Sequence, residues 1–125
     1  MSIEPFIKCS DIQASFAFYT AVLDFKVVRA PDVDPQSFMS MYAFLERDGS
    51  FVHLSAHAGD GVFGNVIYIR VGDIDTVYSR FLQSGLKVQA IAGVSMEPVT
   101  QSWGMKEFAV TDPDGNRITF GENCD

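Results

Sequence analysis

Two stretches of the sequence decide the fold, and they repeat each other: residues 11–27, DIQASFAFYTAVLDFKV, and residues 73–88, DIDTVYSRFLQSGLKV. The two copies align at an offset of 62 residues where they begin and of 61 where they end. Further along, Asp48-Gly49 matches Asp114-Gly115 at an offset of 66 residues. A similarity that keeps its order over half the chain predicts a duplicated structural unit.

Each copy predicts one amphipathic helix. Asp11 and Asp73 can cap the helix starts, and Gly85 can end the second helix. Apolar residues then recur at the spacing of one buried helical face: Ile12, Phe16, Tyr19 and Leu23 in the first copy, and Ile74, Val77, Tyr78, Phe81 and Leu82 in the second.

Strand-like runs surround both helices, and Asp-Gly pairs mark tight hairpin turns. We expect strands over Pro5–Cys9, Phe25–Arg29, Ser40–Glu46 and Ser50–Ala56 in the first half, and over Val66–Val71, Leu86–Ile91, Lys106–Thr111 and Asn116–Phe120 in the second. The order is β-α-β-β-β, twice. This pattern predicts an α+β fold in a single domain of residues 1–125, with tandem modules over residues 1–58 and 64–125.

Alternate residues of a strand point to opposite faces of a sheet, so each expected strand has two sides. One side is aliphatic, and we expect the helices to pack on it, outside the sheets. The other side mixes aromatic with polar residues: Glu4, Phe6, Lys8, Phe51, His53, Tyr68, Arg70, Arg117 and Thr119. We call this side the mixed face. It predicts either a half-solvated surface or, because of its aromatic content, a concave groove that holds a ligand.

Composition excludes several classes of protein. Of the 125 residues 47% are hydrophobic, which suffices for a packed core, and the net charge is −7. A nucleic-acid partner is not expected, because no basic cluster is present to meet phosphates. Cys9 and Cys124 are too isolated in sequence for a disulfide framework or a structural zinc site. With neither a signal peptide nor a membrane-spanning run, we expect a cytoplasmic protein without a membrane partner.

Two groups of residues resemble the vicinal oxygen chelate superfamily, which includes glyoxalases, extradiol dioxygenases and bleomycin resistance proteins. The first is Asp11-Ile12 with Phe18-Tyr19 and Leu23-Asp24-Phe25, and the second is residues 103–116, WGMKEFAVTDPDGN. The second is similar to the bleomycin resistance protein branch. The resemblance covers the whole chain, and it implies a homodimer, because modules of this superfamily commonly pair between chains.

The resemblance also implies four positions at which metal-dependent members hold an ion. In this chain they are Glu4, His53, Val66 and Thr119. Valine has no donor atom and a threonine hydroxyl is a poor ligand for a divalent ion. We therefore expect no tightly held metal, no cofactor and no catalytic residues, with Glu4 and His53 as the remaining pair for a weak divalent ion.

These observations predict a protein of the bleomycin resistance type that binds a hydrophobic, cationic small molecule in a dimer groove without catalysis. The candidate ligand-binding residues are Glu4, Phe6, Phe38, Tyr42, Phe51, His53, Tyr68, Trp103, Glu107 and Thr119. Flat apolar rings and carboxylates suit a planar cation. We expect Lys8, Arg70 and Arg117 near the strand ends with their charges in solvent, and His57 in a solvated loop. Two alternatives are a metal-dependent lyase, isomerase or dioxygenase of the glyoxalase type, and a regulatory subunit that uses the groove for a partner.

Overall fold

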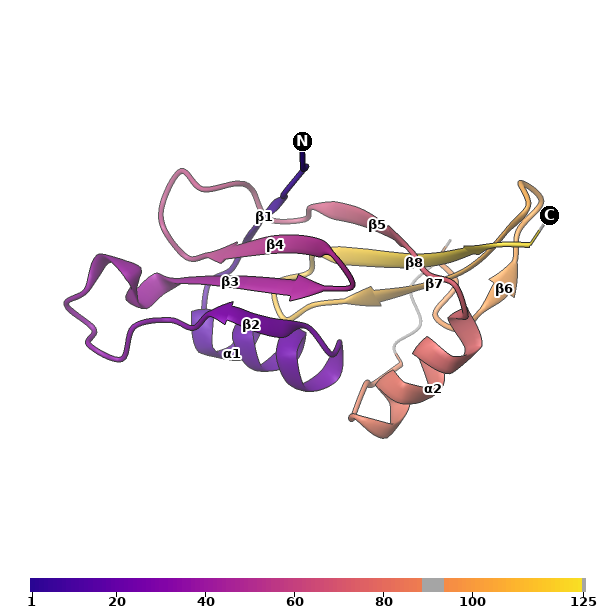
Figure 1. Cartoon of the computed structure of the whole chain (residues 1–125), viewed down its shortest axis with the longest axis horizontal. Helices are drawn as coiled ribbons and strands as arrows, with labels where there is room; N and C mark the ends of the chain where they lie inside the picture. Colours follow the sequence, from indigo (N-terminus) through magenta and orange to yellow (C-terminus); the bar gives the residue numbers. More distant parts are fainter. Residues whose placement is uncertain (89–93, 125) are drawn as a thin grey trace.

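A computed structural model describes residues 1–88 and 94–124 of the chain (Figure 1). The first half contains β1 (Phe6–Lys8), α1 (Ile12–Ala17), η1 (Phe18–Val22), β2 (Lys26–Arg29), η2 (Phe38–Met41), β3 (Tyr42–Arg47) and β4 (Ser50–Ser55). The second half contains β5 (Val66–Arg70), α2 (Ile74–Gln83), β6 (Val99–Thr100), β7 (Met105–Thr111) and β8 (Arg117–Asn123). We call the two halves module one and module two.

Each module forms its own four-stranded mixed sheet. The strand orders are β1-β4-β3-β2 and β5-β8-β7-β6, so the two sheets have the same topology. In each module the first strand pairs with the last in parallel, and the other neighbours are antiparallel. Figure 1 shows the two sheets lying side by side, each with its helix on one side. This arrangement confirms the predicted α+β fold with two tandem modules.

The core lies between the sheets and the helices, on the side predicted from strand parity. Ile7, Leu54, Ile118 and Phe120 are at most 1% exposed, whereas their neighbour Phe6, on the mixed face, is exposed. Buried residues of both helices complete this core, among them Tyr19 and Phe81. Among the described residues, no helix is long and apolar enough to cross a membrane.

The expected strand over Leu86–Ile91 is wrong for residues 86–88, which are not extended into a sheet, and residues 89–91 lie outside the described part. The end of α2 explains the difference. Gly85 has a φ of +100°, and the N–H of Leu86 donates to the carbonyl of Phe81 at 2.9 Å. This left-handed cap directs Leu86 back onto the core. The short strand β6 takes the place beside β7.

The two modules interlock through their hairpin turns. The β7–β8 turn of module two reaches module one, where the buried carboxylate of Asp112 accepts a hydrogen bond from the Tyr19 hydroxyl at 2.8 Å. Asn116 donates from Nδ2 to the carbonyl of Lys8 at 3.0 Å. In the opposite direction, the Arg47 guanidinium at the β3–β4 turn lies 5.1 Å from the ring centroid of Phe81 in α2. These contacts set the position of one sheet relative to the other.

Candidate functional site

The predicted site residues fall into separate clusters, one on the mixed face of each sheet. Strand register creates them: Phe6 and Phe44 are both paired with His53 in module one, and Tyr68 is paired with Thr119 in module two. Side chains paired in this way lie on the same face and touch. We call the two groups the His53 cluster and the Glu107 cluster.

In the His53 cluster the imidazole lies between two phenyl rings. The ring centroids of Phe6 and Phe44 lie 4.4 Å and 4.5 Å from that of His53, and both rings are nearly parallel to it. Phe51 continues the stack at 5.4 Å from Phe44. Strand alternation correctly predicted that Phe6, His53 and Phe51 lie on one face of the sheet. Phe44 was missed, because its place depends on the pairing of β3 with β4, which the sequence alone did not define.

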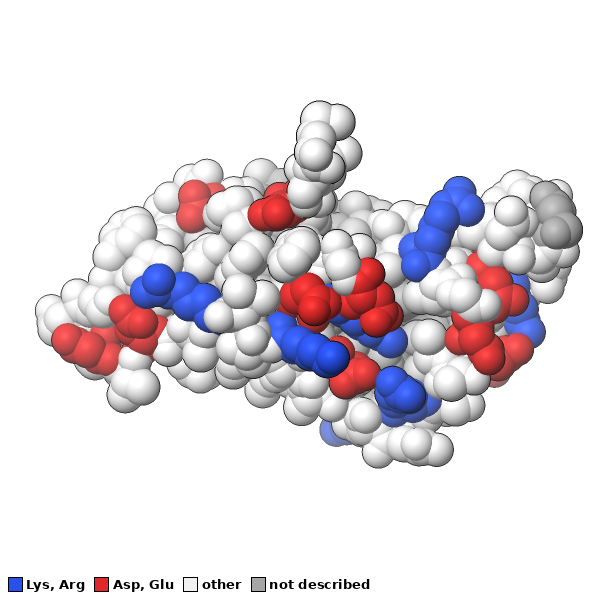
Figure 2. Space-filling view, viewed as in Figure 1, with Lys and Arg blue, Asp and Glu red and all other residues white. Residues whose placement is uncertain are grey.

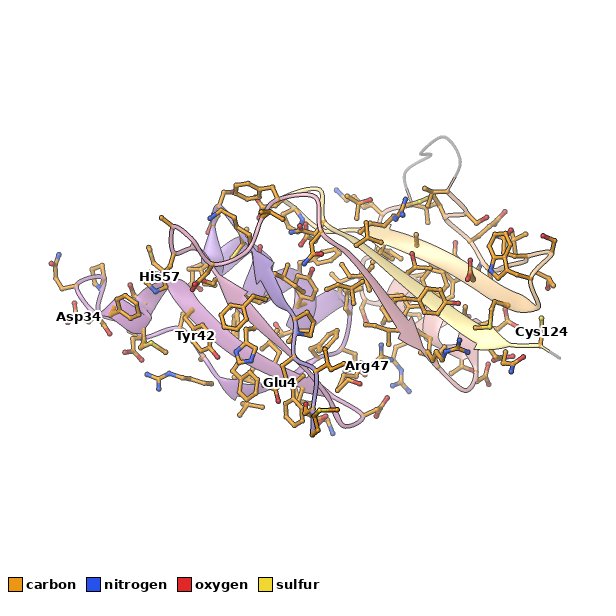
Figure 3. The ribbon with its side chains drawn as sticks, turned by 90° about the horizontal axis from the view of Figure 1, so that it is seen from above. Glu4, Asp34, Tyr42, Arg47, His57 and Cys124 are labelled. Atoms are coloured by element: carbon orange, nitrogen blue, oxygen red, sulfur yellow. The ribbon has the colours of Figure 1, made fainter. Side chains whose placement is uncertain are left out.

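Both ring nitrogens of His53 are engaged. Nε2 lies 2.9 Å from Oε1 of Glu4, and Nδ1 lies 2.5 Å from the Tyr42 hydroxyl. An ionised carboxylate only accepts, so in the neutral imidazole Nε2 carries the proton and Nδ1 accepts from Tyr42. The hydrogen bond from His53, followed by that from Ser2, lowers the pKa of Glu4, whereas burial raises the pKa of Tyr42. Figure 3 labels both residues: Glu4 lies in the segment before β1, and Tyr42 is the first residue of β3.

In the Glu107 cluster one carboxylate is held between two aromatic side chains. Oε2 of Glu107 accepts from the Tyr68 hydroxyl at 2.6 Å and from the Trp103 indole N–H at 3.2 Å. Trp103 lies in a turn before β7, so strand parity does not place it, yet its indole reaches the mixed face. Trp103 is 63% exposed, so its ring is available to a ligand and is not part of the core.

Gly121 makes the contact between Tyr68 and Glu107 possible. It lies on β8 directly between them, and a methyl group at Gly121 would overlap the Tyr68 ring and hydroxyl. Any side chain there would displace the phenol from the carboxylate. The sequence analysis did not identify Gly121, and only the strand register shows its role.

A pocket of about 200 Å³ adjoins the Glu107 cluster, lined by Val94, Ser95, Gln101, Trp103, Glu107, Phe108, Ala109, Arg117 and Thr119. Three predicted residues, Trp103, Glu107 and Thr119, therefore share one pocket. The charge of Arg117 was expected in solvent. Its Nε is instead buried and has no hydrogen-bond partner among the described residues. The pocket thus offers both a carboxylate and a guanidinium.

A second cleft, of about 480 Å³, lies between the edges of the two sheets. It brings Phe51 of module one together with Val66 and Tyr68 of module two, beside the N-terminal residues Ile3 and Pro5. This cleft is the place where predicted site residues from both modules meet within one chain. Its walls are mostly apolar.

Four other residues singled out in the sequence lie outside these clusters or beside them. Phe38 stacks on His57, with the ring centroids 4.1 Å apart, at the end of module one marked by His57 in Figure 3. The expectation of a solvated His57 is wrong: its ring is partly buried, and Nε2 has no partner among the described residues. Lys8 donates to the His57 carbonyl, and the Arg70 guanidinium lies 5.9 Å from the Tyr68 ring centroid. Both residues end their strands, as expected, and Arg70 is exposed, whereas Lys8 is half-buried.

The donor set does not fit a tightly bound metal ion. Glu4 and His53 are bonded to each other, Val66 carries no donor, and Thr119 lies on the other sheet. Within residues 1–88 and 94–124, no group of three or more His, Cys, Asp or Glu side chains could hold an ion. The arrangement favours non-covalent recognition by rings and carboxylates.

The fold and these faces define a class of protein: a pair of β-α-β-β-β modules whose exposed sheet faces carry pockets of small-molecule size. The family model of the Glyoxalase/Bleomycin resistance protein/Dioxygenase superfamily matches residues 5–120, and the chain belongs to this superfamily. A search among curated proteins gives no match.

Solved structures with the same fold include proteins that bind bleomycin or confer resistance to it. A bleomycin-binding protein in complex with bleomycin is 21% identical, with 98% of each chain covered and a TM-score of 0.74. A bleomycin resistance determinant encoded on the transposon Tn5 is 22% identical, with 98% of each chain covered and a TM-score of 0.72. TioX from Micromonospora sp. ML1 is 15% identical at the same coverage, with a TM-score of 0.74.

Proposed function

We propose that this protein binds a planar, hydrophobic, cationic small molecule in a groove formed between two copies of the chain, without making or breaking bonds. The observation that carries the proposal is Glu107, a carboxylate held between the exposed rings of Tyr68 and Trp103. A cation over an aromatic face gains about 0.5 to 2 kcal/mol, depending on exposure. The similarity of the fold to that of a bleomycin-binding protein in complex with bleomycin supports a planar, cationic ligand.

The His53 cluster supplies the second wall in this proposal. Its stacked rings offer a flat surface, and Glu4 contributes a second negative charge. Within one chain, Phe51 of this cluster and Tyr68 of the Glu107 cluster line a common cleft. Two copies related by a twofold axis would allow the His53 cluster of one to face the Glu107 cluster of the other.

A fluorescence titration tests the ligand class. We expect a planar cation of the bithiazole type to quench Trp103 saturably and an anionic aromatic of matched size to bind more weakly. Affinity for the cation should fall as salt rises, because the Debye length is about 10 Å at 0.1 M. Glu107→Gln should weaken binding about tenfold, whereas Asp34→Asn, the same charge change at the remote position labelled in Figure 3, should not. Tighter binding of the anion, through Arg117, would overturn the proposal.

Mixing two defective variants tests whether the groove is shared between copies. Phe6→Ala damages module one and Glu107→Ala damages module two, so neither homodimer binds. If each groove combines module one of one copy with module two of the other, random reassociation restores about a quarter of the grooves, measured by calorimetry. A groove contained in one chain would show no restoration.

Glu4 and His53 favour one alternative, a metal-dependent enzyme of the glyoxalase type, because they are the two superfamily positions here with good donors. Elemental analysis of the purified protein distinguishes this enzyme from a binding protein. A stoichiometric divalent ion that survives purification and is lost in His53→Ala would favour the enzyme.

A further inference from the structure

A cavity of about 380 Å³ lies at the junction of the modules, away from the Glu107 cluster. It is lined by Phe25, Arg47, Asp48, Ser50, Ile69, Arg70, Val71, Gly72, Asp73, Thr76, Val77 and Arg80. These residues come from the β3–β4 turn, the end of β5 and the first turns of α2. None of them lines the pocket that holds Trp103 and Glu107. The cavity is therefore separate from that pocket, although Phe25, Ser50, Ile69 and Arg70 also line the cleft between the sheet edges.

The internal repeat shows what fills the corresponding place in the other half. There, the carboxylate of Asp114 lies against the start of α1, accepting from the Ser10 N–H at 3.1 Å and the Ser10 hydroxyl at 2.6 Å. The counterpart of Asp114 is Asp48, whose side chain is 94% exposed. In module two, the β7–β8 turn thus puts the Asp114 carboxylate against the helix of the other module. In module one, the β3–β4 turn leaves the matching position beside α2 open.

Arg47 is the side chain that lacks a partner in this cavity. Its side chain is only 11% exposed, and Nη1 is buried with no hydrogen-bond partner among the described residues. The nearest carboxylate oxygen, on Asp48, is 4.0 Å from Nε. The other neighbours are the rings of Phe81 and Phe120. Burial lowers the pKa of Arg47, and the carboxylates of Asp24 and Asp48 offset this effect only in part.

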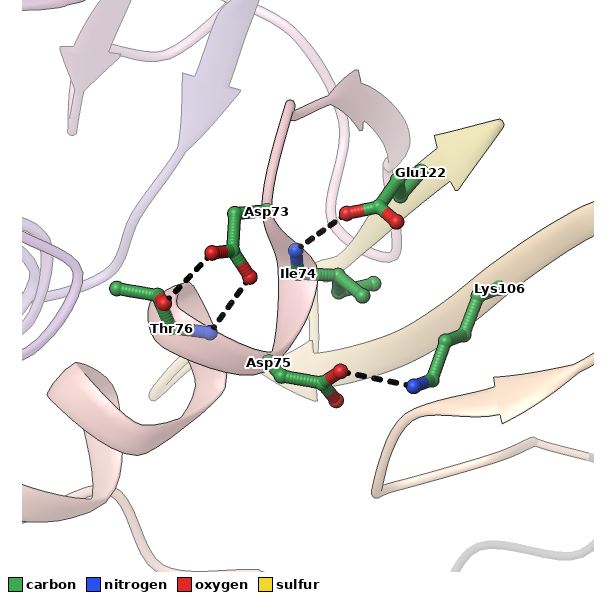
Figure 4. Close-up of polar contacts among 6 residues, drawn as sticks. All are labelled: Asp73, Ile74, Asp75, Thr76, Lys106 and Glu122. Atoms are coloured by element: carbon green, nitrogen blue, oxygen red, sulfur yellow. Dashed lines mark hydrogen bonds and ion pairs between the residues drawn. The ribbon is translucent and has the colours of Figure 1, made fainter. Parts of the chain in front are cut away.

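The acidic side chains around the cavity do not neutralise the positive charge of its arginines. Both carboxylate oxygens of Asp73 are bonded to Thr76, one to its N–H and one to its hydroxyl, as Figure 4 shows. Arg80 is paired with Asp24 at 3.2 Å. Figure 2 shows Lys and Arg side chains gathered between the modules on this face, interleaved with Asp and Glu. Arg47 keeps only the 4.0 Å contact with the exposed Asp48, and Arg70 has no ion pair among the described residues.

We propose that this cavity binds the oxyanion of a small organic molecule, a phosphate ester or a carboxylate, with Nη1 of Arg47 as a principal donor. A guanidinium matches the geometry of these two groups. The volume exceeds what one inorganic anion fills, and pockets of about 300 to 1,000 Å³ are typical of small-molecule sites. Phe25, Ile69 and Val77 provide an apolar wall for the organic part. Because the protein carries a net charge of −7, anions are not attracted to it in general.

Thermal unfolding with inorganic phosphate and phenyl phosphate, against chloride at equal ionic strength, tests the proposal. Both phosphates should raise the Tm saturably, because a ligand that binds only the folded state stabilises it, and phenyl phosphate should act at lower concentration. Arg47→Met should weaken the response at least about tenfold, and because Arg47 also packs on Phe81, the response is measured as the shift from the Tm of this variant without phosphate. Arg29→Met removes an exposed arginine paired with Asp32 and should respond as the wild type does.

A second pair of variants tests whether a carboxylate of the protein itself can occupy the cavity beside Arg47. Ser50→Glu puts a carboxylate into the cavity from the start of β4, and we expect a higher Tm without phosphate and a lost response to it. Ser50→Gln, its neutral match, should keep the response. Trp103 quenching by the cationic ligand should be unchanged throughout, so this site and the proposed function fail separately. No saturable phosphate effect in the wild type, or an equal effect in Arg47→Met, would overturn the proposal.

Discussion

At the scale of single residues, His53 and Glu107 show two ways of holding a polar group on an aromatic surface. His53 is enclosed by rings on both faces and by hydrogen bonds at both nitrogens, so it is fixed in one orientation. Glu107 is held by Tyr68 and Trp103, but these rings remain exposed. The first arrangement is suited to a rigid wall and the second to direct contact with a ligand.

The Tyr68 phenol should titrate late. Partial burial and the hydrogen bond to Glu107 raise its pKa to about 12. Its ordinary value is about 10, so this contact stabilises the fold below pH 10, and the contribution is lost as the pH rises towards 12. Ultraviolet titration of tyrosinate, with Tyr68→Phe to assign the step, should show the pKa falling in Glu107→Gln while staying above its ordinary value. A Tyr68 step near pH 10 in the wild type would contradict the structure.

What the sequence could predict at this scale follows from strand periodicity. Period-two alternation placed Glu4, Phe6 and His53 on one face before any partner strand was known. The same alternation puts Phe44 on the side of Tyr42 and Gly121 on the side of Thr119, but their contacts with His53 and Tyr68 depend on which residues stand opposite each other across strands. Arg117 was assigned to the correct face, but whether its charge reaches solvent depends on the pocket around it.

At the scale of elements, the two hairpin turns have the same position in the repeat but different roles. Asp112 in the β7–β8 turn is 4% exposed and accepts from Tyr19, from the N–H of Asp114, and from both the backbone and the side chain of Asn116. The β3–β4 turn instead exposes Asp48. The turn of module two is therefore a fixed connection, and that of module one borders a cavity.

Replacing Asp112 should destabilise the whole protein. Asp112→Ala leaves the buried Tyr19 hydroxyl and the Asn116 amide without their acceptor, which should cost about 3 kcal/mol of the free energy of unfolding. Asp48→Asn, in the matching turn, is the control and should change stability by less than about 0.5 kcal/mol, because its side chain is exposed and asparagine tolerates the φ of +50° at this position. Urea denaturation measures both. Equal effects of the two substitutions would mean that the Asp112 network contributes little.

The order of elements was predictable because each has a local signal, namely a capping aspartate, a helical face or an Asp-Gly turn. The residues at which elements begin and end were harder to predict. Residues 40 and 41 were expected in a strand but belong to η2, and the first helix becomes π-helical at Phe18. The strand expected over 86–91 looked extended in sequence, but the cap at Gly85 determines the direction of the chain after α2.

At the scale of the whole molecule, we predict a homodimer. Phe6, Tyr68 and Trp103 are at least 39% exposed in one chain, and a second copy would cover part of this aromatic surface. A stable pair should bury at least about 1,000 Å². Sedimentation at micromolar concentration should show a species of twice the chain mass. A single-chain mass under these conditions would contradict the prediction and, with it, the shared groove.

The interlocked turns also have a consequence for how the chain acquires its structure during synthesis. Tyr19 and Lys8 receive their partners from Asp112 and Asn116, residues 93 and 108 positions later in the chain. Contacts this distant slow folding, because the intervening chain must be ordered before they form. Module one leaves the ribosome before module two, yet its buried tyrosine has no acceptor until residue 112 is made. We therefore expect the nascent N-terminal half to be the protease-sensitive, chaperone-dependent stage in the production of this protein.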